Sequence, residues 1–392
     1  MSAETTSSPV PQPDTSATSR RPTRRLRILH LILVLGETNS QYNEHCLPQM
    51  EQRDLAICTY FPPKLAPPPD IALYPGNGTL RGFFRALREA LTEREYDAVH
   101  AHSPHTAVLL PLRLLSRPRF WRLWRSMVLT VHDSFYDYKP RNQAMTLVGL
   151  ALFERVVFCS HAALESLPPA ARRLTGARAR VVQNAADLER VAAVVDGVRP
   201  WDDELFRVVS VGRLEQVKDP STMLAAFAAA ADSGCRLQLI GAGALEDTLA
   251  QEITSRGLGW QVRTTGLVPR DDVFRAYAHA DLFVSVSHGE GLPVAVMEAM
   301  AAGLPVILSD IPPHREVADG LDVVPLVPPG DVAGFAREIT RIRALPAEER
   351  LEIGKACRAW VLERFTLQGM HEGYDHVYRE LIDPAELPCS SS

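Results

Sequence analysis

The stretch that decides the fold is SVSHGEGLPVAVMEAMAAGLPVILSD, residues 285–310. Pro293 suits the first turn of a helix, where its missing N–H costs little, and Gly303 suits the position just past the helix end. Residues 281–287 (DLFVSVS) and 305–310 (PVILSD) are apolar and β-branched, so they predict two buried parallel strands. The loop between the first strand and the helix is therefore expected at the carboxyl edge of a sheet, where open α/β folds bind ligands.

Two carboxylates, Glu290 and Glu298, are separated by seven residues in this stretch, the first on the loop and the second inside the predicted helix. The backbone N–H groups of Gly291 and Leu292 lie at the helix N-terminus, which favours a diphosphate. The pattern predicts a site for a phosphorylated sugar. The alternative is a pair of solvated charges beside a turn, and the two flanking buried strands argue against it.

Strands alternate with helical patterns along the rest of the chain, as in doubly wound α/β domains. We expect a disordered tail over residues 1–27, a Rossmann-like domain over 28–190, a linker over 191–203 and a second Rossmann-like domain over 204–365. A C-terminal helix over 366–385 is expected to pack back on the first domain. The predicted fold class is thus α/β, with two Rossmann-like domains facing a deep cleft.

Composition excludes several classes of protein. The 392 residues are 46% hydrophobic and 23% charged, as in an ordinary globular protein. Residues 1–190 carry 24 Lys+Arg and 17 Asp+Glu (+7), whereas residues 191–392 carry 18 and 30 (−12), so the amino half is the expected face for an anionic surface. No basic stripe interleaved with aromatics and no zinc-finger spacing occur, which argues against nucleic acid as a partner.

The six cysteines have no CxxC or metal-ligand spacing, and the apolar run 28–35 is far shorter than the ~20 residues that span a bilayer. These features predict reduced thiols in a cytoplasmic protein.

Five motifs in the second half resemble those of the retaining GT-B glycosyltransferases of family 4. In order they are Val211-Gly212-Arg213 with Lys218, Gly241-Ala242-Gly243, Gly266-Leu267-Val268, Glu290 to Glu298, and EAMAAGLPV over residues 298–306. The amino half resembles the family more loosely, through Thr130-Val131-His132-Asp133, Ser160 and Asn184-Ala185-Ala186-Asp187. The resemblance extends over residues 26–380 and implies the GT-B fold.

The resemblance implies transfer of a sugar from a UDP- or GDP-linked donor to a hydroxyl acceptor, with retention at the anomeric carbon and without a metal ion. It assigns Arg213 and Lys218 to the diphosphate, Glu298 to the ribose and Glu290 to the sugar ring. Gly212, Gly241, Val268, Gly291 and Leu292 complete the expected donor site. Cations suit this chemistry because the leaving diphosphate gains negative charge, and no DxD pair is evident to hold a metal. A phosphorylase, a sugar-nucleotide epimerase and a non-catalytic nucleotide-sugar-binding module remain alternatives.

The histidines of the amino half are candidates for the facing wall. His132 closes the strand VLTVH, and the resemblance places it near the donor sugar and acceptor as a catalytic residue; a structural histidine is the alternative. His100, His102 and His105 could hold a metal, but strand alternation puts only His100 and His102 on one face, which leaves the ligand set incomplete. His102 is instead expected on the acceptor side.

The loop after the first strand departs from the family, which often has a glycine pair there. This chain has Gly36-Glu37-Thr38-Asn39, so we expect Glu37 and Asn39 on the acceptor side, facing a sugar, small-molecule or lipid-linked acceptor.

Residues 113–127 carry five arginines among leucines, Phe120, Trp121 and Trp124. One interpretation is an interfacial patch, with Arg119, Arg122 and Arg125, that contacts anionic lipid at the inner face of the membrane. The other is a solvated segment whose aromatics pack on the domain, since Pro118 interrupts any continuous helix.

Overall fold

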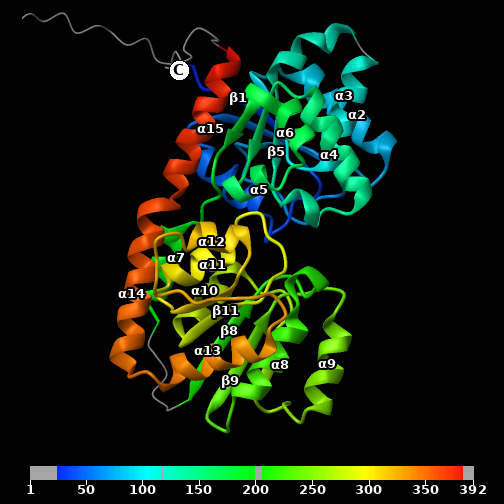
Figure 1. Cartoon of the computed structure of the whole chain (residues 1–392). Helices are drawn as coiled ribbons and strands as arrows, with labels where there is room; N and C mark the ends of the chain where they lie inside the picture. Colours follow the sequence, from blue (N-terminus) through cyan, green and yellow to red (C-terminus); the bar gives the residue numbers. More distant parts are fainter. Residues whose placement is uncertain (1–23, 117, 199–204, 383–392) are drawn as a thin grey trace, which may run out of the picture.

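The computed structural model describes residues 24–116, 118–198 and 205–382, and its two α/β domains lie one above the other in Figure 1. The first domain holds a seven-stranded sheet in the order β3-β2-β1-β4-β5-β6-β7, with every pair parallel. Its strands are β1 (Arg27–Ile32), β2 (Asp54–Thr59), β3 (Ala72–Tyr74), β4 (Ala98–Ala101), β5 (Met127–Val131), β6 (Arg155–Phe158) and β7 (Ala179–Val181).

The second domain holds a six-stranded parallel sheet in the order β10-β9-β8-β11-β12-β13. Its strands are β8 (Phe206–Val211), β9 (Cys235–Ile240), β10 (Val262–Thr264), β11 (Leu282–Ser285), β12 (Val306–Ser309) and β13 (Leu326–Val327). Near-continuous burial along β4, β5 and β12 explains their unbroken apolar sequences, because helices cover both faces of a parallel sheet. The prediction of two Rossmann-like domains of GT-B type is confirmed.

Helices cover both faces of the first sheet. Phe83 and Leu87 of α2 (Leu80–Glu93), Leu110 of α3 (Pro104–Leu115) and Leu150 of α4 (Pro140–Leu152) pack in the core of one face. The short α1 (Ser40–Asn43) and the C-terminal α15 (Leu367–Ile382) contribute to the core of the other face. The small helices α5 (His161–Glu165) and α6 (Pro169–Thr175) complete this domain.

The second sheet is covered in the same way. Helices α7 (Leu188–Val195), α10 (Arg270–Ala278), α11 (Val294–Ala301) and α14 (Ala347–Arg364) share one core. Helices α8 (Pro220–Ala230), α9 (Glu246–Ser255) and α13 (Val332–Ala344) share the other, and α12 (Pro312–Val317) follows β12.

The chain crosses between the domains twice, and the two crossings lie side by side. Ala186, before α7, pairs with Thr366, between α14 and α15. Beyond this point α15 returns along the first sheet, where Tyr374 and Tyr378 are buried against Ile28 and Val128 (Figure 1). The two domains are thus fastened together at one side of the molecule.

Several expected boundaries fall partly on undescribed residues. Most of the expected tail, residues 1–23, lies outside the described residues, and Arg24 already contacts Asp97. The expected linker, 191–203, begins within α7, and its last five residues lie outside the described part, as do residues 383–385. Among the described helices, none is both long and apolar enough to cross a membrane.

Candidate active site

A cleft of about 940 Å³ lies between the domains, where the carboxyl ends of strands from both sheets face each other. The first domain contributes residues after β1, β4 and β5, including His102, His132 and Asp133. The second contributes Arg213 after β8, the 3₁₀ helix Gln216–Lys218 and Gly289 after β11. This is the edge of each sheet at which α/β folds bind ligands.

Lys218 is held by a strained turn. Asp219, which follows it, has φ of 45°, the one positive φ among the non-glycine residues that the structure describes. The Asp219 carboxylate caps α8 through the backbone N–H of Thr222 and contacts Nε2 of His288 at 2.8 Å. A left-handed aspartate costs conformational energy, and these contacts offset it. The turn directs Lys218 onto Glu290, with which it forms an ion pair.

Glu290 is a buried anion on the loop after β11. Burial opposes its ionisation, but Lys218, His314 and a hydrogen bond of 2.8 Å from the Ser287 hydroxyl outweigh burial and lower its pKa. Arg213 is more open: its guanidinium is 62% exposed and contacts Glu215 at 2.7 Å. The structure therefore brings three of the four predicted catalytic residues to one wall of the cleft, and leaves the Arg213 cation accessible from solvent.

The glycine loop of residues 289–292 is seated against the first domain. Its carbonyls at Glu290 and Gly291 accept hydrogen bonds from the Ser134 and Ser160 hydroxyls at 2.8 and 2.7 Å. A Cβ on Gly291 would lie 1.8 Å from the carbonyl oxygen of His132. Glycine is required here by close approach of two backbones, which explains Gly291 without reference to a ligand. Leu292 is likewise buried, and its carbonyl accepts from Asn184 at 3.3 Å.

Glu298 lies inside α11 but away from the cleft lining. Its carboxylate contacts Arg270 at 2.9 Å, and the same guanidinium contacts Glu44 of the first domain at 2.6 Å. Burial raises the pKa of both carboxyls, that of Glu44 to about 8, although Arg270 opposes the rise. The two glutamates of the sequence motif therefore have different partners, and Glu298 belongs to an ion-paired group that joins the domains.

The other predicted donor-site residues have clear structural environments. A Cβ on Gly241, whose φ is 138°, would meet the carbonyl oxygen of Gly212 at 1.9 Å, so these glycines let the ends of β8 and β9 approach. Val268 packs at the margin of the core that contains α11.

On the acceptor side, Asn39 lines the cleft and caps α1 by accepting from the Tyr42 N–H at 2.8 Å, whereas Glu37 is exposed and outside the lining.

Two carboxyl groups on the first-domain wall were not expected from the sequence as site residues. Asp133 lies beside His132, and burial raises its pKa although Lys218 and Arg213 oppose the rise. Burial, together with Asp133 and Glu290, raises the pKa of Asp137 to about 6. The position of Asp133 directly after a strand ending in histidine was the available signal; Asp137, in a short 3₁₀ helix, offered none.

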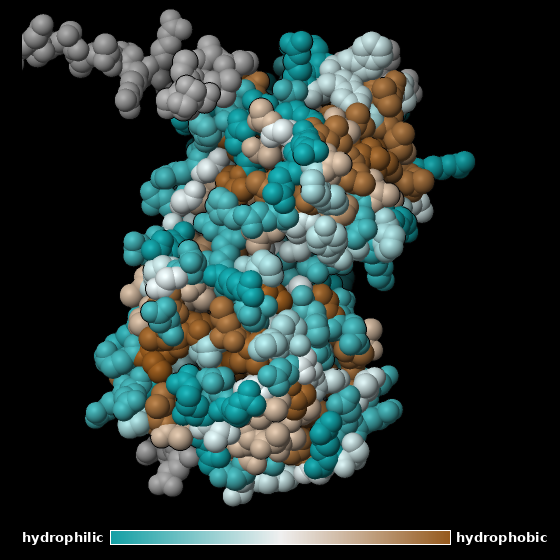
Figure 2. Space-filling view, in the orientation of Figure 1, coloured by the Kyte–Doolittle hydropathy of each residue, from teal (hydrophilic) through white to brown (hydrophobic). Residues whose placement is uncertain are grey.

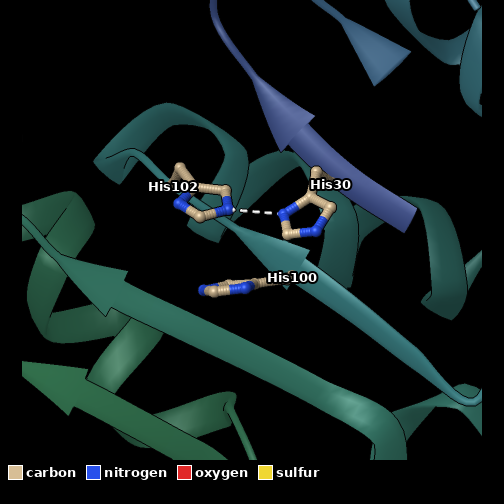
Figure 3. A group of neighbouring side chains, drawn as sticks. All are labelled: His30, His100 and His102. Atoms are coloured by element: carbon tan, nitrogen blue, oxygen red, sulfur yellow. Dashed lines mark hydrogen bonds between the residues drawn. The ribbon is translucent and has the colours of Figure 1, made fainter. Parts of the chain in front are cut away.

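Three histidines from two adjacent strands, β1 and β4, meet behind this wall (Figure 3). His30 on β1 lies in register with His100 on β4, and nitrogens of His30, His100 and His102 lie within 4.8 Å of one another. The third histidine that the sequence analysis found missing is thus His30, not His105. Hydrogen bonds nevertheless occupy both nitrogens of His100, at 2.7 Å each to Tyr378 and Thr130, and His30 Nδ1 bonds His102 Nε2 at 2.9 Å.

Two family models match the chain. "Glycosyl transferases group 1" matches residues 196–360, and "Glycosyltransferase Family 4" matches residues 50–190. The two matches adjoin and correspond to the two domains.

Several relatives have the curated names of glycosyltransferases. A "2-deoxystreptamine N-acetyl-D-glucosaminyltransferase" of Niallia circulans is 25% identical over 64% of this chain and 68% of its own length. A "UDP-Gal:alpha-D-GlcNAc-diphosphoundecaprenol alpha-1,3-galactosyltransferase" of Escherichia coli is 24% identical over 86% and 87%. A "GDP-mannose:cellobiosyl-diphosphopolyprenol alpha-mannosyltransferase" of Xanthomonas campestris matches at 28% over 57% of this chain and 59% of its own length.

Solved structures share the fold. A sucrose-phosphate synthase from Thermosynechococcus elongatus superposes with a TM-score of 0.77 at 18% identity, over 91% of this chain and 99% of the other. Anabaena HepE in complex with UDP and glucose superposes with a TM-score of 0.71, also at 18% identity, over 91% and 100%.

Proposed function

Because this chain belongs to the GT-B glycosyltransferases of the group 1 and family 4 type, we propose that it transfers a sugar from a nucleotide-diphosphate donor to a hydroxyl acceptor with retention at the anomeric carbon. The observation that carries the proposal is the cleft itself. One wall presents Arg213 and Lys218, with Glu290 paired to Lys218, and the other presents His132, so cations and a hydrogen-bonding group face the same space.

In this proposal the cations stabilise the leaving group. Arg213 is exposed to the cleft and can bind phosphate oxygens with its planar guanidinium. Lys218 supplies a point charge that is already neutralised in part by Glu290, so donor binding would redistribute an existing ion pair rather than bury a new charge. Glu290 would contact the sugar ring, and Glu298 the ribose after exchange of its Arg270 contact. UDP- and GDP-linked donors are the first to test, since both occur in the names of relatives.

Retention is proposed to proceed by attack on the same face from which the diphosphate leaves. A double displacement would need a carboxylate nucleophile beside the anomeric carbon. Asp133 and Asp137 line the cleft on the first domain, and the proposal gives neither of them a covalent role. In this route the leaving phosphate is the base that takes the acceptor proton.

A lipid-linked acceptor at an anionic membrane is proposed from the surface of the first domain. Figure 2 shows an apolar area over α3 and α4, to which the exposed side chains of Leu112, Leu115, Leu147, Val148 and Leu152 belong. Trp121 is 55% exposed beside it, and Arg122 and Arg125 are exposed, whereas Phe120 is buried and Trp124 packs against the core. The segment thus combines both interpretations: some aromatics pack inward, and a basic, apolar face remains outside. The side chain of Arg119 lies outside the described residues.

The first experiment is a screen of nucleotide sugars by thermal unfolding, in which a ligand at 100 times its Kd adds about 2.7 kcal/mol. The stabilising donor is then incubated with sugar, small-molecule and polyprenyl-diphosphate acceptors, and the anomeric configuration of the product is read by NMR. A retained glycoside supports the proposal. Release of a sugar 1-phosphate or an epimerised donor without acceptor would instead show a phosphorylase or an epimerase, and binding without turnover would show a binding module.

A further inference from the structure

Three histidines form a hydrogen-bonded chain that runs from the interior of the first domain to the cleft. His30 Nδ1 bonds His102 Nε2 at 2.9 Å, and His102 Nδ1 bonds His132 Nε2 at 3.0 Å. Figure 3 shows the first of these bonds. The three residues come from β1, from the end of β4 and from the end of β5, which are neighbours in the sheet, so the chain crosses the strands at their carboxyl edge.

The two rings at the inner end of the chain are buried. His30 is fully buried and His102 is 6% exposed. Burial is the main cause that lowers the pKa of every member, to about 3 for His30 and about 4 for His132, and that of His102 falls well below its ordinary value. Each ring is therefore neutral near pH 7 and carries a single N–H.

With one proton on each ring, only two arrangements satisfy both hydrogen bonds. If His30 protonates Nδ1, His102 must protonate Nδ1 and His132 must protonate Nδ1 as well. If His30 protonates Nε2, the other two rings follow with Nε2. The tautomer of His132 is thus tied to that of His30, two rings away, and Nδ1 of His132 is the nitrogen that remains for a group in the cleft.

The surroundings of His30 favour the first arrangement. Its Nε2 is buried and has no hydrogen-bond partner. Arg53 carries a positive charge that acts on His30 and contributes to its lowered pKa. This charge favours a lone pair on Nε2 of His30 over an N–H group there. An unpartnered N–H is also the less common kind of buried orphan. The N–H groups of all three rings then point along the chain toward the cleft.

We propose that His30 and His102 are positioning residues that hold His132 as the neutral Nδ1–H tautomer, a hydrogen-bond donor to an oxygen of the bound donor or acceptor. Three aligned imidazole dipoles place their positive end at the cleft without a net charge. No proton needs to leave the chain, because the donated hydrogen bond strengthens as the oxygen gains charge. The role in transfer rests on the proposed function, whereas the tautomer itself does not.

The tautomer is measured without turnover, by long-range ¹H–¹⁵N correlation of the full-length protein labelled with ¹⁵N-histidine. His132, assigned by its loss in His132→Gln, is expected as a single Nδ1–H species. A wild-type His132 protonated on Nε2, or an even mixture, would overturn the proposal whatever the enzyme's activity proves to be. So would one equivalent of Zn²⁺ retained after dialysis against Zn²⁺-containing buffer and lost in His30→Phe, since His30 would then be a metal ligand.

A matched pair of variants tests the coupling. His30→Phe removes the inner end of the chain, and His100→Phe changes an equally buried ring that is in register with it but bonds Tyr378 and Thr130 instead. We expect His30→Phe to convert His132 to a tautomer mixture and to lower kcat with donor KM unchanged, about twofold for an even mixture, because only the Nδ1–H fraction can donate. His100→Phe should leave the His132 tautomer intact. Equal spectra in both variants would refute the coupling. If either phenylalanine variant fails to fold, His30→Asn and His100→Asn are compared instead.

Discussion

The two walls of the cleft solve the problem of buried polarity in opposite ways. On the second domain, Lys218 and Glu290 are charged and stabilise each other as an ion pair, and Arg213 keeps its charge by remaining largely exposed. On the first domain, His30, His102 and the cleft histidine, His132, avoid charge, because burial lowers their pKa, and two hydrogen bonds link them in a chain.

This difference suggests a division of labour. A charged wall can bind a dianionic leaving group, but Lys218 and Glu290 are each costly to remove because the partner is then left unpaired where it has little access to water. A neutral wall can hold the sugar and acceptor by oriented hydrogen bonds, and its members can be exchanged with less electrostatic cost. The predictions below use this asymmetry.

The largest effect is expected on the charged wall. Lys218→Ala should lower kcat by about 10²–10³, because it removes a preorganised cation whose value is greatest when the leaving phosphate gains charge. Arg213→Ala should lower it by a similar order. Steady-state transfer rates, with folding checked by circular dichroism, measure this.

Lys355 is the matched control, because it forms an exposed pair with Glu352 on α14, far from the cleft lining. Lys355→Ala should transfer sugar at the wild-type rate. A folded Lys218→Ala enzyme with near wild-type kcat would contradict the assignment of Lys218 to the diphosphate.

The comparison of the walls also shows what the sequence could reveal. The strand and helix around Glu290 and Glu298 follow from local periodicity, Pro293 and Gly303, and so does the placement of Lys218 after β8. The histidine chain does not, since it depends on the order β1-β4-β5, which brings His30 beside His100 and His102 across 70 residues of sequence. The Arg270 contact that joins Glu298 to Glu44 depends on the relative placement of the domains, which no local pattern encodes.

A second, smaller effect should separate the two glutamates of the charged wall. Glu298→Gln should weaken binding of the nucleotide diphosphate and of the whole donor alike, since its proposed partner is the ribose. Glu290→Gln should reduce transfer about tenfold or more while diphosphate affinity stays almost unchanged, because its proposed partner is the sugar ring. Calorimetry with the free diphosphate decides between them: equal losses of affinity in both variants would refute the division.

The exposed surface of the first domain around Arg122 and Arg125 offers a third test. Arg122→Ala with Arg125→Ala should weaken binding to vesicles of anionic lipid about 30-fold at low salt, since each basic residue near such a surface contributes roughly 1 kcal/mol. Arg337→Ala with Arg341→Ala on α13, exposed arginines of the other domain, is the control and should bind like wild type. Negligible wild-type sedimentation at both low and high salt, together with transfer to a water-soluble acceptor, would refute membrane docking.

The smallest effect concerns the contact between the domains in which Arg270 binds both Glu44 and Glu298. Burial raises the pKa of Glu44 to about 8 in the folded protein, above the ordinary value of 4.5, so the folded state binds more protons than the unfolded state between these values. The stability due to this group is full below pH 4.5 and is lost as pH rises toward 8. Buried histidines act oppositely, because the unfolded state, in which their pKa has its ordinary value of 6.5, still binds protons at and somewhat above pH 6.5. The contribution of Glu44 is therefore measured between pH 6.5 and 8 as a difference between wild type and variant, in which the histidines cancel.

In that range the free energy of unfolding of the wild type relative to Glu44→Gln should fall by at most about 1.4 kcal/mol per pH unit, the limit for one proton. The reason is that the amide of the variant keeps a contact with Arg270 but does not titrate. Glu352→Gln, on the exposed surface of α14, should follow the wild type. Urea unfolding at pH 6.5, 7.2 and 8 measures the slopes, and a Glu44→Gln slope as steep as that of the wild type would show that Glu44 is already ionised, with Arg270 outweighing its burial.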